Sequence, residues 1–426
     1  MNFQVINFKK IIFLIVFILL VFGISNKAFA ATEFVSTIQQ TGGDYATLFA
    51  WEAAINTDLT TSTTKVFSGS VTGTIADAAG VTLWRSSTST EITGVSKHNT
   101  ATQILIASIS SSTYSFQVGD QWRVTASTTN YFQISDTGDS AIATAKIDGS
   151  WTSADTTVVA IVGWTTTSTN YINIYTTATA RHNGKWDTGK YRLEVTLSAD
   201  GSAVWVREEF TKIDGLQIKA SNSSAVSTYG IFNFVDNVNS ELRISNSIIK
   251  TGTLTAGSQN ITGLISSGAR SNNNFLWNNI IYDFKNGTRG MGIYFGADTG
   301  YNMVVHSYNN TIYNSVDGIV INVRVNYFAK NNIVQGANDG YNGTFATSSD
   351  YNISDIAGDA PNATFATTSK IVNFVSTSTG DFHLVSTDTS AKDTGTDLSA
   401  DPNLAFTTDI DGQTRGSIWD IGADEL

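Results

Sequence analysis

Apolar and polar positions alternate through the second half of the chain around a short phrase that recurs four times. Each phrase holds an asparagine followed by aliphatic residues. The copies are "SNSIIKTG" from position 245, "NNIIYDFKNG" from 278, "NNTIYNSVDGI" from 309 and "NNIVQGANDG" from 331. Aligned on Asn246, Asn279, Asn310 and Asn332, they are 33, 31 and 22 residues apart. Since a strand sends every second side chain to one face, these asparagines are predicted to lie on the inward, apolar face of successive strands.

A second phrase, in which a glycine leads a short β-prone run, follows the related segment "TKIDGLQIK" from position 211 and each of the first three copies. The runs are "YGIFNF" from 229, "TGLISS" from 262, "MGIYFG" from 291 and "DGIVIN" from 317. A strand, a turn, a second strand and a return make one coil of a parallel β-solenoid. Stacked coils bring equivalent residues to within about 4.8 Å, so we expect the four asparagines to form a hydrogen-bonded ladder. The pattern predicts an all-β solenoid.

Other parts of the chain follow different patterns. In "GGDYATLFAWEAAIN", from Gly42, the residues Leu48, Trp51 and Ile55 share one helical stripe after Thr47, a suitable N-cap. We expect a helix that caps the first coil. Positions 86–149 alternate like strands but lack the asparagine phrase, so they are predicted to form a small inserted β module. The predicted division is a leader at 1–30, the N-terminal cap and first coils at 31–85, the inserted module, the β-helix at 150–375 and a C-terminal cap segment at 376–426.

The first 30 residues have the pattern of a processing signal. Lys9 and Lys10 precede an apolar run over 11–24, and small residues Ala28 and Ala30 stand at the cleavage positions. The run is short for a membrane span, which needs about 20 residues. We therefore expect a signal peptide, an extracellular or cell-surface location and no membrane span after its removal; a retained anchor is the alternative.

The composition of the chain argues against some classes of binding partner and metal site. The net charge is −11, and loss of the three leader lysines makes it −14. An acidic chain is a poor candidate for nucleic-acid binding. The chain has no cysteine and only two prolines, which excludes disulfides and thiolate metal sites and suits a β-rich secreted protein.

The C-terminus carries a family resemblance. "DIDGQTRGSIWDIGADEL", from 409, resembles the ending of uncharacterised "choice-of-anchor" bacterial proteins in the pectin-lyase-like superfamily. "FHLVSTDTSAKDTG", from 382, is similar to their preceding segment, with Ser390 in place of a proline. The resemblance runs from about Phe210 to the end and implies a right-handed parallel β-helix.

The same ending has two physical interpretations. Arg415 can pair with Asp420 or Glu425 across a turned-back segment and so cap the exposed edge of the last coil. The alternative is calcium on Asp409 and Asp411, although Thr414 stands where an EF-type loop would place glycine.

The resemblance also implies that an enzyme must be considered, because the superfamily includes polysaccharide lyases and glycosidases. Asp317 and Asp339 each follow their key asparagine by seven residues, so they should stack on adjacent coils and could share Ca²⁺. Each also precedes glycine, and Asp-Gly is a common turn pair. Arg289 and Arg324 are candidate bases. The glycosidase signatures of the superfamily are absent from this sequence.

Two groups of residues could bind a glycan. A basic cluster lies in "ARHNGKWDTGKYR" and comprises Arg181, His182, Lys185, Trp186, Lys190 and Arg192. The alternative for this cluster is a solvated loop between strands. Tyr282 and Tyr313 are predicted to face outward on neighbouring coils, either as a platform for sugar rings or as an ordinary cross-strand pair.

Taken together, these patterns favour a secreted or cell-surface, non-catalytic β-helix protein with a structural, adhesive or glycan-binding role. The alternative is a lyase or hydrolase acting on an extracellular acidic polysaccharide. No cofactor is expected apart from the Ca²⁺ considered above.

Overall fold

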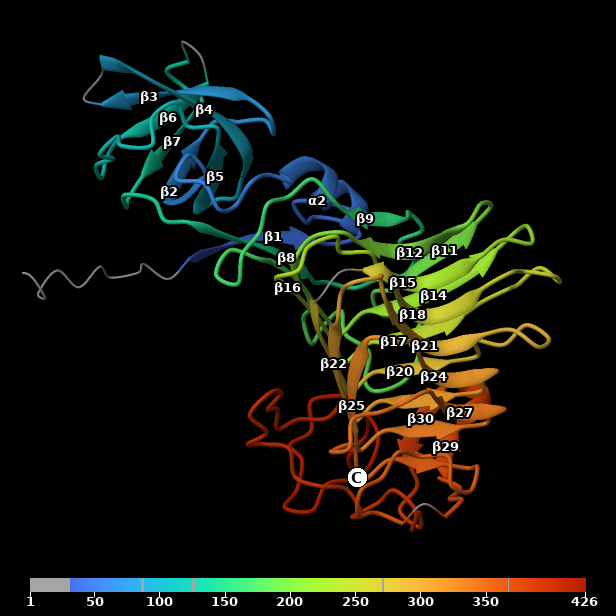
Figure 1. Ribbon diagram of the computed structural model, residues 1–426. Coiled ribbons are helices and arrows are strands. Elements are labelled where there is room, and N and C mark those ends of the chain that lie inside the picture. Colours follow the sequence, from blue (N-terminus) through green and yellow to red (C-terminus); the bar gives the residue numbers. More distant parts are fainter. Residues whose placement is uncertain (1–30, 86–87, 125–126, 270–271, 367) are drawn as a thin grey trace, which may run out of the picture.

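Most strands of the chain stack in parallel, one coil upon the next, along a single axis (Figure 1). The computed structural model describes residues 31–426 except 86–87, 125–126, 270–271 and 367. The predicted leader at 1–30 lies outside the described residues. Successive strands pass from one sheet to the next, so that β13, β14 and β15 form one coil and β16, β17 and β18 the next. The prediction of an all-β parallel β-helix is confirmed.

Three parallel sheets form the walls of this β-helix. The first sheet has eight strands: β1 (Thr32–Ile38), β8 (Ala141–Ile147), β10 (Ile172–Thr176), β13 (Phe210–Asp214), β16 (Ser240–Ser245), β19 (Asn272–Trp277), β22 (Met303–Tyr308) and β25 (Val325–Lys330). The second has seven: β11 (Leu193–Leu197), β14 (Gln217–Asn222), β17 (Ile248–Thr251), β20 (Ile280–Tyr282), β23 (Thr311–Tyr313), β26 (Ile333–Gln335) and β28 (Ile353–Ser354). The third also has seven: β9 (Val159–Ile161), β12 (Gly201–Val206), β15 (Thr228–Asn233), β18 (Ile261–Ala269), β21 (Met291–Ala297), β24 (Asp317–Ile321) and β27 (Asp339–Asn342).

A ladder of buried asparagines runs through the turn between the first and second sheets. The side-chain oxygen of Asn310 accepts hydrogen bonds from the backbone N–H and the side-chain amide of Asn279, at 3.0 and 2.9 Å. Asn332 does the same for Asn310, and Asn352 for Asn332. The predicted ladder is confirmed at Asn279, Asn310 and Asn332.

The assignment of Asn246 to this ladder was wrong. Strand pairing aligns Ser245 with Trp277, so Asn246 is equivalent to Asn278, and Ser247 takes the inner place beside Asn279. Asn246 instead occupies the outer corner, with a left-handed φ of 48°. The phrase "SNS" has one asparagine where the later coils have two. Ser247 can replace the inner asparagine because its Oγ accepts a hydrogen bond from the N–H of Leu216 at 3.2 Å.

The repeated glycines form a second column, in the third sheet, that makes room for the aliphatic residues of the second sheet. A Cβ on Gly230 would lie 2.5 Å from Ile249 Cγ2, and one on Gly292 would lie 2.5 Å from Ile312 Cγ2. Real Cβ atoms essentially never show contacts this short, so only glycine fits in these coils. The glycine of the second phrase therefore packs against the aliphatic residue of the first phrase.

The predicted capping helix is α2 (Leu48–Ile55). The Thr47 side chain accepts the N–H of Ala50 at 3.1 Å, which confirms the N-cap. Leu48, Trp51 and Ile55 are fully buried in the main core, and Trp51 lies against Trp164 with 5.6 Å between ring centroids. The helix covers the apolar end of the first coils.

An antiparallel closed barrel interrupts the first coils and projects from that end of the β-helix (Figure 1). Its strands are β2 (Lys65–Thr72), β3 (Gly80–Arg85), β4 (Thr88–Asn99), β5 (Gln103–Ala107), β6 (Gln121–Val124) and β7 (Tyr131–Ile134). The predicted bounds of 86–149 miss β2 and β3 and include β8, which pairs with β1 and β10. Alternation alone cannot tell an antiparallel barrel strand from a solenoid strand, because both have a period of two.

The last residues of the chain brace the side of the β-helix. Phe382, Ile410 and Ala423 cover Ile248 and Ile280 on the outer face of the second sheet. Leu398, Leu404 and Trp419 cover Phe275 and Tyr308 on the first sheet. This segment also contains β29 (Phe374–Ser376), the 3-10 turn η1 (Thr377–Thr379) and β30 (Asp381–Leu384). We call 372–426 the C-terminal brace.

The predicted cap on the last coil is therefore corrected in position. Arg415 does pair with Glu425, at 3.0 Å, but its other donor reaches Asn278 Oδ1 at 2.9 Å, in a middle coil. Asp420 instead accepts hydrogen bonds from the N–H groups of Asp393 and Leu426.

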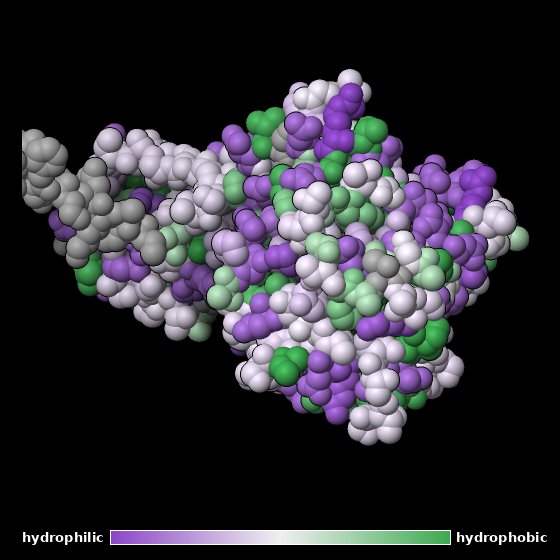
Figure 2. Space-filling view, turned by 60° about the horizontal axis from the view of Figure 1, so that its bottom comes forward, coloured by the Kyte–Doolittle hydropathy of each residue, from purple (hydrophilic) through white to green (hydrophobic). Residues whose placement is uncertain are grey.

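The lower end of the molecule presents hydrophilic and hydrophobic residues intermingled rather than one continuous apolar face (Figure 2).

Candidate functional site

The side chains of the predicted basic cluster already have ion-pair or hydrogen-bond partners within the protein, so they are not free to bind a ligand. Arg181 pairs with Asp214, and His182 is 1% exposed with its Nε2 2.9 Å from the carbonyl oxygen of Asn246. Burial, with the charge of Arg181, lowers the pKa of His182 to about 4, so this imidazole is neutral near neutral pH.

The remaining members of the cluster have partners as well. Lys185 pairs with Asp381 at 3.2 Å, Lys190 donates to the carbonyl of Thr179 at 2.9 Å, and Arg192 pairs with Glu194 at 2.9 Å. Trp186 lies beneath the ammonium group of Lys250. The cluster is a structural loop whose charges are largely compensated.

Tyr282 and Tyr313 lie on adjacent coils, as predicted, since they pair in the register of β20 and β23. They do not form an open platform. Tyr282 is 2% exposed, and the ring of Phe382 lies 5.0 Å from Tyr282 and 5.3 Å from Tyr313. The C-terminal brace covers the face on which a sugar would have to stack.

Asp317 and Asp339 are also register partners, at the starts of β24 and β27, so their predicted stacking is confirmed. Burial raises the pKa of Asp317, and burial with the charges of Asp359 and Asp317 raises that of Asp339. Both are half-buried, and each precedes a glycine of the packing column. Metal binding there stays a prediction.

The outer face of the third sheet carries an aromatic groove that the sequence patterns did not single out. Trp205 of β12 and Phe232 of β15 are register partners whose ring planes differ by 8°, with centroids 6.3 Å apart. Tyr229 lies 5.4 Å from Phe232. All three are half-buried, which leaves aromatic surface open to solvent.

These rings line a groove of about 580 Å³ together with several polar residues. The other lining residues are Val158, Thr196, Leu197, Ser198, Ala199, Asp200, Gly201, Ser202 and Ser227. The guanidinium of Arg207 lies 5.1 Å from the ring centroid of Trp205. Apolar walls with a few polar groups at the edge are typical of small-molecule and sugar sites.

The position of Phe232 is apolar in the next coils as well. In register after Phe232 come Ile265, which is buried at 7% exposed, and the half-buried Tyr294 and Val320, one per coil. The signal for this column was present in the second phrase, since the residue two positions after each glycine is Phe232, Ile265, Tyr294 or Val320. The second phrase predicted a strand in each coil but not this column, because the alternation of a strand does not by itself show which outward residues stay exposed.

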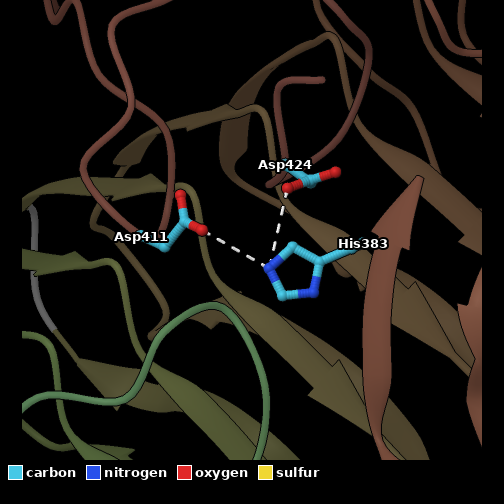
Figure 3. Close-up of side chains that lie close together, drawn as sticks. All are labelled: His383, Asp411 and Asp424. Atoms are coloured by element: carbon cyan, nitrogen blue, oxygen red, sulfur yellow. Dashed lines mark ion pairs between the residues drawn. The ribbon is translucent and has the colours of Figure 1, made fainter. Parts of the chain in front are cut away.

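A second cluster lies within the C-terminal brace and combines a histidine with aspartates (Figure 3). His383 Nδ1 is 2.5 Å from Asp381 Oδ1, while its Nε2 lies 3.4 Å from Asp411 Oδ2 and 4.0 Å from Asp424 Oδ1. The donor atoms of His383, Asp411 and Asp424 all lie within 4.8 Å of one another. Asp409, adjacent to Asp411, accepts the N–H of Glu425 at 3.1 Å and thereby anchors the terminal turn.

Across the described residues, no helix is long and apolar enough to cross a membrane. Comparison of the chain with protein-family models, curated proteins and solved structures finds no match in any of the three. The resemblance to pectin-lyase-like proteins therefore remains a prediction.

Proposed function

We propose that this protein is exported and binds a polysaccharide, without cleaving it, along the outer face of the third sheet. The single observation that carries the proposal is the aromatic groove of Trp205, Tyr229 and Phe232 on a wall of regularly spaced strands. The signal-like leader supports the extracellular or cell-surface location.

The spacing of aromatic side chains on successive coils suits the binding of a polymer. Successive coils place the exposed faces of Trp205 and Phe232 next to each other along the axis, with 6.3 Å between their ring centroids. That spacing is close to the length of one sugar unit in an extended chain. The C–H face of a sugar ring packs on an aromatic ring, and its hydroxyl groups reach the polar residues of the groove. A linear glycan can therefore lie across Trp205 and Phe232 with one unit per coil.

The net negative charge of the protein favours a neutral over an acidic polysaccharide, while charges of both signs lie near the groove. Asp200 lines the groove, Arg207 lies beside Trp205, and the register column of Ser202 and Tyr229 reaches Asp317 and Asp339 several coils away. Carboxylates accept hydrogen bonds from hydroxyl groups but repel uronate sugars. A chain of net charge −14 without its leader adds to that repulsion.

The test is calorimetric titration of the protein lacking its leader with soluble neutral and acidic polysaccharides. Neutral glucans, mannans and xylans are compared with pectate and alginate. We expect binding to a neutral polymer and a loss of about tenfold or more in affinity, about 1.4 kcal/mol, in Trp205→Ala and in Phe232→Ala.

Trp186→Ala is the matched control, because it removes an indole from the basic cluster outside the groove. Its affinity should equal that of the wild type, with folding of each variant checked by circular dichroism. Equal losses in Trp186→Ala and Trp205→Ala, or binding to acidic polymers alone, would contradict the proposal.

The same samples test the catalytic alternative. Unsaturated products that absorb in the ultraviolet, dependent on calcium and lost in Asp317→Asn, would show a lyase and overturn the non-catalytic proposal. We expect the polymer length to stay unchanged.

A further inference from the structure

His383 is held so that one ring nitrogen points at two carboxylates. Its Nδ1 contacts Asp381 Oδ1 at 2.5 Å, and this contact fixes the ring orientation. Its Nε2 therefore faces Asp411 and Asp424 (Figure 3). Gly184 lets the ring sit this close to the loop after β10, since a Cβ at that position would collide with it.

Asp424 makes the arrangement costly without a cation. Its residue is 4% exposed, and its Oδ2 accepts the N–H of Leu384 at 2.7 Å. Its Oδ1 is shielded from solvent and accepts no hydrogen bond within the described part of the chain. A buried oxygen of a carboxylate without a partner costs free energy, and a second carboxylate nearby adds repulsion.

We propose that His383, Asp411 and Asp424 bind one divalent transition-metal cation of the Zn²⁺ class. An imidazole nitrogen with two carboxylate oxygens is a donor set that Zn²⁺ accepts, whereas Mg²⁺ and Ca²⁺ prefer oxygen alone. Two ligands about 2.1 Å from Zn²⁺ at the tetrahedral angle lie about 3.4 Å apart. The distance from His383 Nε2 to Asp411 Oδ2 is 3.4 Å, so this pair already has that spacing. Asp424 Oδ1 lies 4.0 Å from His383 Nε2, and all three ligand atoms lie within 4.8 Å of one another, so Asp424 must move closer.

Asp381 has the position of an outer-shell partner. A metal-bound histidine commonly donates its other N–H to a carboxylate, which sets the tautomer and leaves the second nitrogen for the metal. Asp381 is in turn paired with Lys185, from the loop between β10 and β11. The site thus couples the C-terminal brace to the wall of the β-helix, and the bound ion would join β30 to the 409–411 turn and the terminal turn.

Protonation of His383 is the alternative to a metal ion for compensating the charges of Asp411 and Asp424. The hydrogen bonds of His383 to Asp411 and Asp381 raise its pKa to about 9, against the opposing effect of burial. The experiment must therefore detect the metal itself. Protein without an affinity tag is stripped with a chelator and titrated with Zn²⁺ by calorimetry, and then with Mn²⁺, Ca²⁺ and Mg²⁺. We expect one Zn²⁺ per chain, weaker Mn²⁺ binding and a rise in Tm with Zn²⁺.

Three variants test the site: two change a proposed ligand and one changes the outer-shell partner Asp381. Asp424→Asn keeps an acceptor for the N–H of Leu384 but removes the charge, so it preserves the fold. Asp424→Asn and Asp411→Asn should each weaken Zn²⁺ binding by more than about 100-fold, since loss of an outer-shell partner alone costs about 10–100-fold. Asp381→Asn should fall within that smaller range.

His98→Gln is the matched control. His98 also contacts two aspartates, but through different ring nitrogens, Nδ1 to Asp77 at 2.8 Å and Nε2 to Asp44 at 3.5 Å, so they cannot share one ion. Its Zn²⁺ affinity should match the wild type. Absence of Zn²⁺ binding, or binding that survives in Asp424→Asn and Asp411→Asn, would overturn the proposal. Neither result bears on glycan binding, which is measured at a different face.

Discussion

Two adjacent asparagines in three of the four repeats have different physical roles. The second of each pair, such as Asn310, is fully buried and hydrogen-bonds to the coils on both sides. The first, such as Asn309, takes a left-handed φ of 52° at the outer corner, a conformation that asparagine tolerates better than most residues. The doubled "NN" of the sequence thus encodes both a core ladder and a turn.

The inner asparagines should dominate stability. In Asn310→Ala, the N–H of Asn279 loses its acceptor and the carbonyl of Leu276 loses its donor. Each buried group left unpaired costs about 1–3 kcal/mol. We expect a matching fall in the free energy of unfolding, measured by urea denaturation.

Asn338→Ala is the control for this prediction, because Asn338 is exposed. Its effect should stay within about 0.5 kcal/mol. Equal effects of the two substitutions would contradict the ladder as a source of stability.

Sequence alone predicted the inner ladder and the N-cap at Thr47 because both depend on local spacing. It could not place His383 beside Asp411 and Asp424, since these residues meet only when the brace folds back on itself. It predicted the pairing of Tyr282 with Tyr313 but not their cover by Phe382, for the same reason.

At the scale of elements, the C-terminal brace follows from two demands of the β-helix wall. Outer residues such as Ile280 and Tyr308 are apolar and need cover. The corner asparagines also offer amide groups, and Asn309 donates to the carbonyl of Gly422 while Asn331 donates to that of Thr396, at 3.0 and 2.8 Å. The brace satisfies both demands along several coils.

Arg415 is the central fastener of the brace. Its side chain has no exposed surface and pairs with Glu425 while donating to Asn278 and the carbonyl of Gly422. Arg415→Met would leave the carboxylate of Glu425 buried and unpaired, a change that typically costs about 3–5 kcal/mol. We expect faster amide hydrogen exchange over 409–426 and a red shift in the fluorescence of Trp419.

The double variant Arg415→Met with Glu425→Gln separates charge from packing. Removing the stranded charge should recover part of the lost protection. If the single and double variants exchange equally fast, the ion pair is not what holds the brace.

At the scale of the whole molecule, a titratable contact joins the barrel to the β-helix. His98 of the barrel contacts Asp44 and Asp77 and stacks near Tyr45, whose hydroxyl donates to Asp77 at 2.9 Å. Burial opposes the charge on His98, but the hydrogen bonds to both aspartates outweigh it and raise the pKa of His98 to about 9.

The docking of the barrel should therefore depend on pH. A raised histidine pKa stabilises the docked state fully below its ordinary value of 6.5, and this contribution is lost as the pH rises through about 9. We expect the radius of gyration from X-ray scattering to increase across that window in the wild type and to be independent of pH in His98→Gln.

Lys97 needs its own control, because burial lowers the pKa of Lys97 and could move it into the same window. Lys97→Met should keep the transition. A transition that persists in His98→Gln and disappears in Lys97→Met would assign the effect to the lysine.

The barrel enters and leaves the β-helix at a single point. Val66 and Asp139 exchange two backbone hydrogen bonds, each of 3.0 Å, so the chain returns to within one strand spacing of where it departed. Its core of Phe67, Trp122 and Phe132 is separate from that of the coils. In evolutionary terms, such a closed excursion is a point of insertion. Another small domain whose ends lie close together could be inserted there, and the coils below and the outer face of the third sheet would keep their structure.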